Sequence, residues 1–176
     1  MLKKWLGITL ILLLSIALVA CSSKEKNVTA KVKVTEENKS YLEEYDESLQ
    51  GFIEEMTGIL QTFNDSLDGI YTKELTREQF SSNLKESINN SNKLVTDVES
   101  VDVDPELFEA HQNLIVIINR SHQLLLNAID MANTADTEID KDTLRNEYME
   151  IKTSQATIAN EWKILRAQLQ ADKEGK

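Results

Sequence analysis

The chain of 176 residues holds 30 acidic and 19 basic residues, a formal net charge of −11. This excess of acid argues against nucleic acid as a partner, because phosphates are bound by clustered lysine and arginine. Cys21 is the only cysteine, which excludes an intramolecular disulfide and a haem attached through a cysteine pair.

Residues 1–20 have the three-part layout of a secretory signal. Lys3 and Lys4 precede an uncharged run over residues 6–17 that is dominated by Leu and Ile, and small residues follow before Cys21. The run falls short of the ~20 apolar residues that span a bilayer. We therefore expect residues 1–20 to be removed on export, which leaves 156 residues, enough for one compact domain.

Leu18, Val19 and Ala20, directly before Cys21, resemble the lipobox of bacterial lipoproteins, and the resemblance covers residues 1–21 only. It implies that Cys21 carries a diacylglyceryl group and that the protein is anchored on the extracytoplasmic face of the cell membrane. Each CH2 buried in the bilayer contributes ~0.8 kcal/mol, so two or more acyl chains hold a protein firmly. The alternative is an uncleaved helical anchor with an incidental cysteine.

Residues 22–35 form the predicted tether between the lipidated cysteine and the rest of the chain. They hold four lysines and one acidic residue, a net charge of +3, which leaves −16 on residues 36–176. The tether has the period of a strand, with apolar residues at Val28, Ala30, Val32 and Val34. No later segment repeats this period, so we expect an extended, flexible linker. Its basic charge beside anionic lipid, with an acidic body repelled by that surface, would hold the domain off the membrane.

From residue 36 onward, apolar residues recur at steps of three and four, the period of an amphipathic helix. A first helix is predicted over residues 36–71, with apolar positions at Leu42, Tyr45, Leu49, Phe52, Met56, Ile59, Phe63 and Ile70. Thr76 forms a capping box with Gln79 three residues later. This motif predicts a second helix that opens there and ends near Ser100.

Asp104 and Pro105 combine an N-cap with a proline in the first turn, so a third helix is predicted to begin there, with Phe108 and Leu126 beside its apolar stripe. A fourth helix follows residues 133–140. Short connections make sequential helices antiparallel neighbours, so we predict an all-α, up-down-up-down four-helix bundle over residues 36–176. A three-helix body with one helix projecting or broken is the alternative.

His111 and His122 are the candidate metal or ligand residues. They stand eleven residues apart, which places both on the apolar stripe of the third helix ~16 Å from each other, too far for one metal to bridge unaided. The Glu-x-x-His motif of bundle di-metal sites needs glutamate where Phe108 and Asn119 stand. We therefore expect no metal and no cofactor, and histidines bonded to Tyr, Asn or backbone groups at the edge of the core.

The connection before the fourth helix is rich in carboxylates. Asp136, Glu138, Asp140 and Glu147 occupy positions one, three, five and twelve of a calcium loop of the EF-hand type. Position six needs glycine for its sharp turn, and Lys141 stands there. We therefore predict a solvated acidic turn in which Asp140 caps the fourth helix.

Gly51, Gly58 and Gly69 fall within the first predicted helix at separations of seven and eleven, so all three point away from its apolar stripe. Each costs ~1 kcal/mol relative to alanine, and small residues flank them, so a partner helix or a second copy could dock there. The other interpretation is that the glycines merely soften a long helix. Gln155 and Ser91 lie in apolar stripes, where polar residues more often fix helix register than bind ligands.

No segment offers a nucleophile in a glycine-bounded turn or a glycine-rich phosphate loop, so no enzymatic activity is predicted. The favoured hypothesis is a membrane-anchored extracytoplasmic lipoprotein whose acidic bundle contacts another envelope or membrane protein. The rival is a receptor that binds a small ligand or metal near the two histidines. The abundance of Lys, Asn, Ile and Glu favours a Gram-positive cell, whereas Ser22 after the cysteine is compatible with outer-membrane sorting in a two-membrane cell.

Overall fold

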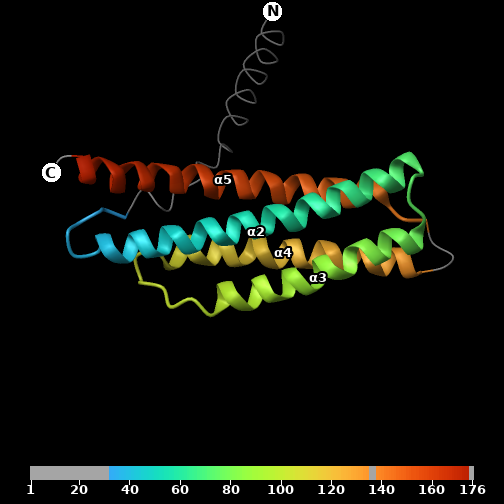
Figure 1. Cartoon of the computed structure of the whole chain (residues 1–176), viewed down its shortest axis with the longest axis horizontal. Coiled ribbons are helices and arrows are strands. Elements are labelled where there is room, and N and C mark those ends of the chain that lie inside the picture. Colours follow the sequence, from blue (N-terminus) through green and yellow to red (C-terminus); the bar gives the residue numbers. More distant parts are fainter. Residues whose placement is uncertain (1–31, 135–137, 175–176) are drawn as a thin grey trace, which may run out of the picture.

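The computed structural model describes residues 32–134 and 138–174, with side chains as far as residue 171, and these residues contain four α-helices and no strand (Figure 1). The signal segment, Cys21, most of the tether and Asp136 lie outside the described residues. None of the four helices is apolar over a sufficient length to span a bilayer. They are α2 (Lys39–Thr72), α3 (Arg77–Glu99), α4 (Phe108–Asn133) and α5 (Lys141–Glu174).

The four helices form one bundle in which each helix runs antiparallel to the next (Figure 1). Sequential helices pack against each other, and α5 returns to pack against α2. This arrangement confirms the predicted up-down-up-down bundle, and the three-helix alternative is wrong. The end of the bundle that carries residue 32 and the start of α2 is here called the tether end. The opposite end, with the connections α2–α3 and α4–α5, is called the far end.

The last residues of the tether pack onto the bundle. Val32 is buried and belongs to the core cluster. Thr35 and Asn38 bond each other reciprocally, since the backbone N–H of Thr35 donates to Oδ1 of Asn38 (2.8 Å) and that of Asn38 donates to Oγ1 of Thr35 (3.3 Å). This turn precedes the regular helix, so α2 begins at Lys39 and not at residue 36.

The connection from α2 to α3 is a helix stop followed directly by a helix start. Lys73 adopts the left-handed backbone conformation (φ 62°), and the carbonyl of Gly69 accepts the N–H of Leu75 (3.0 Å). Thr76 then caps α3, because its hydroxyl accepts the N–H of Gln79 (3.3 Å) while its own N–H donates to the Gln79 side chain (2.9 Å). The predicted capping box is confirmed.

The start of α4 differs from the prediction. The carbonyl of Asp104 accepts the N–H of Leu107 (2.9 Å), so residues 105–107 form a separate, tighter turn. The first bond of the regular helix runs from the His111 N–H to the Leu107 carbonyl (2.9 Å), and α4 therefore begins at Phe108. The proline and the N-cap identify the turn correctly, but the regular helix starts after it.

The predicted apolar stripes form the core between the four helices. The largest fully buried side chains come from the connections and from α2, α3 and α4, and include Phe63, Phe80, Leu42, Met56, Leu60, Leu67, Leu84, Leu94, Leu107, Leu114, Ile118 and Leu124. Phe108 and Leu126, expected beside the third stripe, are instead 58% and 38% exposed. Each follows a buried leucine, and one step along a helix rotates a side chain by about 100°, which turns both residues out of the core.

Candidate interaction surface

His111 is enclosed by hydrogen bonds within the bundle. It is 3% exposed, its Nε2 lies 3.0 Å from the carbonyl of Val98, and its Nδ1 lies 2.9 Å from the hydroxyl of Tyr45. A carbonyl can only accept, so Nε2 carries the proton and Nδ1 accepts the Tyr45 hydroxyl. A metal bound through His111 would have to displace Tyr45.

His122 has a different partner, on the neighbouring helix. Ser91 donates its hydroxyl proton to the carbonyl of Ile88 (3.0 Å), so Nδ1 of His122 must donate to Oγ of Ser91 (2.7 Å). The two histidines share no partner. Within the described residues, no three His, Cys, Asp or Glu side chains gather in a geometry that could hold a metal ion.

Asp140 acts as the N-cap of α5. Its Oδ1 accepts the N–H of Thr143 (3.0 Å) and its Oδ2 accepts the Thr143 hydroxyl (2.8 Å). These bonds, the backbone one first, hold the pKa of Asp140 below its usual range. Both oxygens of Asp140 are thus used in starting the helix, as predicted, and Asp136 lies outside the described residues.

The three glycines of α2 do not form one open strip. A side chain added at Gly51 or Gly58 would meet no atom within 4 Å, so both positions are open. Gly69 is buried, and a Cβ there would come 2.6 Å from Cγ and Cδ1 of Leu75. The expectation that Gly69 lines a docking strip is wrong, because the connection after α2 folds back over it. Ser66, one of the small residues near these glycines, is buried as well.

A partly buried polar network at the tether end was not predicted from the sequence. The indole N–H of Trp162 in α5 donates to Asp46 in α2, and Arg166 donates to both oxygens of the same carboxylate (Nε, 3.0 and 3.1 Å). Gln50 supplies a further donor (2.9 Å). The ring of Tyr45 lies 5.1 Å from that of Trp162, which joins this network to His111. Its α2 and α5 members are more than a hundred residues apart in sequence, and no local pattern indicates such a pairing.

Gln155 is the polar group in the middle of the core. It is buried, its Nε2 donates to the hydroxyl of Thr57 in α2 (2.7 Å), and its Oε1 accepts from Lys152 (2.6 Å). This bond between α5 and α2 is made at one register only, in agreement with the role expected of a polar residue in a stripe. Like the histidines, it is bonded within the bundle.

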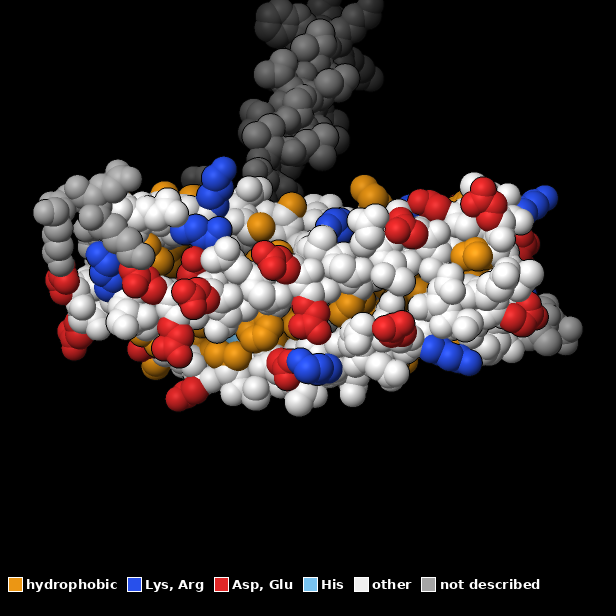
Figure 2. Space-filling view, in the orientation of Figure 1, with side chains coloured by type: hydrophobic (Ala, Val, Ile, Leu, Met, Phe, Trp, Pro, Cys, Tyr) orange, Lys and Arg blue, Asp and Glu red, His pale blue; other side chains and the backbone are white. Residues whose placement is uncertain are grey.

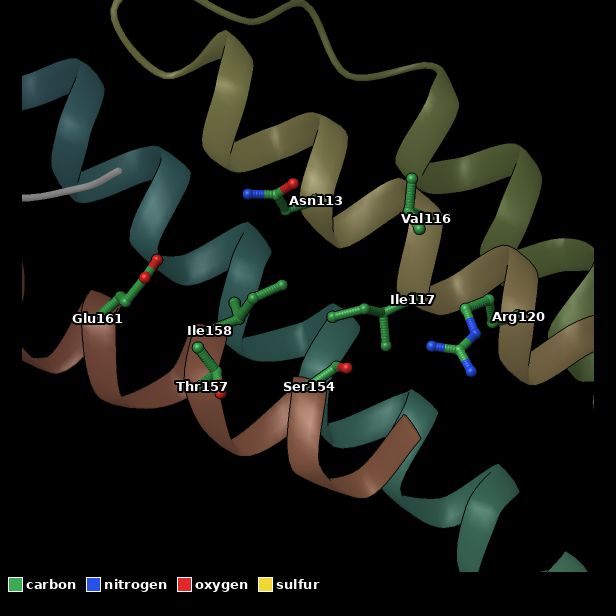
Figure 3. A pocket seen from close by; sticks show the side chains of 8 residues that line it. All are labelled: Asn113, Val116, Ile117, Arg120, Ser154, Thr157, Ile158 and Glu161. Atoms are coloured by element: carbon green, nitrogen blue, oxygen red, sulfur yellow. The ribbon is translucent and has the colours of Figure 1, made fainter. Parts of the chain in front are cut away.

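One opening on the described surface is a groove between α4 and α5 (Figure 3). Apolar side chains of Val116, Ile117 and Ile158 line it together with polar ones, and the full lining is Asn113, Val116, Ile117, Arg120, Ser154, Thr157, Ile158 and Glu161. It encloses about 240 Å³, below the ~300–1,000 Å³ of sites that bury a small organic ligand. The groove therefore suits a side chain or a helix from another protein better than a free metabolite.

Charge and exposure on the rim support the same conclusion. Arg120 crosses from α4 to α5 and pairs with Glu150 (2.7 Å), which closes one end of the groove. Val116, which lines the groove, is 54% exposed. Figure 2 shows apolar side chains reaching the surface in several places between acidic ones.

One sequence signal could have found this groove. Residues 114–118 are five consecutive apolar residues, and five residues in a row cover more than a full turn of helix, so they cannot all face one core. Ile117 and Ile118 are buried while Val116 faces solvent.

Comparison with protein-family models, with curated proteins and with solved structures finds no match for the chain.

Proposed function

We propose that the protein is a lipoprotein, anchored through Cys21 to the outer face of the cell membrane, whose acidic helical bundle binds another protein of the envelope. The signal pattern of residues 1–21 supports the anchor. The surplus of acid on residues 36–176 argues against nucleic acid. The bundle itself supports a binding role outside its core.

The observation that carries the proposal is the contrast between a bonded interior and an open groove. The buried side chains that could bind a ligand, His111, Ser91 and Gln155, bond to groups of the bundle itself. The α4–α5 groove is lined by three apolar and five polar or charged side chains, and its Val116 is more than half exposed. Recognition therefore takes place on this surface.

An amphipathic helix of a partner protein is the occupant that fits the groove. Two antiparallel helices present a long furrow, and a third helix can lay an apolar face along it. The partner's apolar side chains would contact Val116 and Ile158, while its polar flank would meet Asn113, Ser154 and Thr157. This mode resembles bundle packing itself, so it requires no new kind of contact.

The anchor is tested by mass spectrometry and fractionation of the native product. The wild-type chain should lack residues 1–20, carry added lipid mass on Cys21 and sediment with membranes. Cys21→Ser should remove the lipid mass and release the protein. A native product that retains residues 1–20 without added lipid would contradict the anchor, while leaving the groove untested by that measurement.

The groove is tested with two matched variants on α4. Val116→Glu places a charge in the lining of the groove, whereas Leu126→Glu places one at an exposed apolar position that does not line the groove. Only Val116→Glu should abolish copurification of the partner from detergent-solubilised membranes. A photo-crosslinking residue at 116 should form an adduct that one at 126 does not. Equal behaviour of the two positions would rule out the groove as the contact surface.

A further inference from the structure

One titratable group connects three helices at the tether end. His111 in α4 bonds to Tyr45 in α2 and to the carbonyl of Val98 in the last turn of α3. Tyr45 in turn packs against Trp162 of α5, with ring centroids 5.1 Å apart. We propose that His111 is a pH-sensitive clamp, and that protonation of its ring loosens the tether end of the bundle while the far end stays folded.

The geometry explains why the ring is held neutral. Nε2 already donates its proton to Val98, so an added proton must go to Nδ1, the atom that accepts the hydroxyl of Tyr45. Tyr45 would then have to rotate its own proton away and accept instead. Its ring is held between Trp162 and Tyr41, with a centroid distance of 6.4 Å to the latter, so adjustment there disturbs the packing of neighbouring rings.

Within the described residues, no charged side chain bonds to the His111 ring, and of the two groups that do, only the Val98 carbonyl favours a positive charge on it. From α2 His111 meets the neutral Tyr45, and from α3 it meets a backbone carbonyl. On α5 the neighbour of Tyr45 is the indole of Trp162, and the charged Arg166 beyond it is paired with Asp46. At the end of α3, Asp97 is paired with Lys93 and Glu99 accepts from Asn119, both on the exposed side.

The direction of the pH effect follows from burial. Loss of water around the ring lowers the pKa of His111 from its ordinary value of 6.5, and the bond to Val98 offsets this only in part. Between 6.5 and the lowered pKa, the unfolded chain binds a proton that the folded chain does not. The stability that the neutral His111 contributes is therefore fully present above pH 6.5. It falls as the pH drops from 6.5 to the lowered pKa and does not fall further below that pKa. Carboxylates titrate mostly below this range.

The molecule supplies its own probes for a test. The chain has two histidines and two tryptophans, so Trp5→Phe leaves Trp162 at the clamp as the only indole. In the full chain in detergent micelles, a shift from pH 7 to pH 5 should move Trp162 emission to longer wavelength. Protection of the backbone amides of residues 98–111 against hydrogen exchange should fall. The fall should be about tenfold for each unit by which burial lowers the pKa of His111. Protection over residues 67–80, at the far end, should not change.

Two variants separate the clamp from general acid effects. His111→Gln retains a donor for Val98 but cannot titrate, so both responses should vanish, whereas His122→Gln should retain them. If His111→Gln does not fold, the NMR titration of the two ring signals in the wild-type chain decides the matter. A His111 signal that titrates at or above 6.5, or a pH response unchanged in His111→Gln, would overturn the proposal. None of these measurements depends on the lipid anchor or the groove.

Discussion

The two ends of the bundle are closed in different ways. At the far end local contacts close the helices, since Gly69 meets Leu75, Thr76 bonds Gln79, and Asp140 caps its own helix, and the long-range bonds there use exposed or partly buried side chains. At the tether end the closing contacts join residues distant in sequence, from Tyr45 to His111 and from Asp46 to Arg166, and Tyr45, His111 and Trp162 among them are buried.

This difference has a consequence for stability. A local cap forms as soon as its own turn forms, whereas the tether-end contacts exist only when all four helices are assembled. The far end has long-range contacts as well: Arg77 donates to the carbonyls of Ala132 (3.2 Å) and Thr134 (3.0 Å), Tyr71 donates to Asp142 (2.8 Å), and Arg145 pairs with Asp68. The side chains that make these bonds are exposed or only partly buried, unlike those of Tyr45, His111 and Trp162 at the tether end. We therefore expect substitutions at the tether end to have the largest effects.

The largest effect is expected for Trp162→Ala. Trp162 is 2% exposed, contacts Tyr45 and donates to Asp46. Loss of a buried indole should lower the free energy of unfolding by about 3–5 kcal/mol. Urea unfolding followed by circular dichroism measures this, and Ile164→Ala, two positions on and half exposed, is the control that should change it by less than about 0.5 kcal/mol. Equal effects of the two substitutions would contradict a special role for the tether end.

Asp46→Ala should have the next largest effect. It leaves the Trp162 indole and the Arg166 guanidinium without their common acceptor, so unfolding should become easier by about 1–3 kcal/mol. Asp46→Asn keeps one oxygen as an acceptor but loses the charge, so it separates the bond to Trp162 from the ion pair. If the ion pair matters more than the bond, the asparagine variant will lose nearly as much stability as alanine, and its deficit will shrink at high salt.

The parts of the structure that were predictable from sequence are those that depend on short spacings. Residues within a few positions of one another determine each of these features: the four helices, their antiparallel order, the Thr76 capping box and the Asp140 cap. Steps of three and four identify the buried face of a helix because they follow from helix geometry. The start of α4 was misplaced by one turn, since Asp104 and Pro105 begin a tight turn that precedes the regular helix.

The functional features escaped prediction because they form between distant segments. The α4–α5 groove brings Val116 and Ile158 together, and nothing near either residue indicates the other. The bond between His111 and Tyr45 was foreseen only as one of several kinds of partner. Gly69 misled the prediction because helical spacing placed it with Gly51 and Gly58, whereas the chain beyond the helix folds back to cover it.

Gly69→Ala and Gly58→Ala should act in opposite directions. At position 69 the new methyl would meet Leu75, so the packing of the far end must shift and stability should fall by about 1 kcal/mol or more. At position 58 the space is open, and alanine should raise stability by up to about 1 kcal/mol through its better helix propensity. Thermal unfolding of the two variants measures both. A loss of stability at position 58 would show that its side is already in contact with something, such as a second copy.

Thr76→Ala is the smallest expected effect and tests the local character of the far end. Loss of the cap should cost about 1 kcal/mol, because the backbone N–H of Gln79 loses the Thr76 hydroxyl that accepts its hydrogen bond. Thr96→Ala on the same helix is the matched control, since the Thr96 hydroxyl bonds only back to the carbonyl of Asn92 and alanine favours the helix. Amide exchange should show the loss confined to the start of α3. If protection around His111 fell as well, the two ends would be coupled, and the far end could not be treated as a self-contained closure.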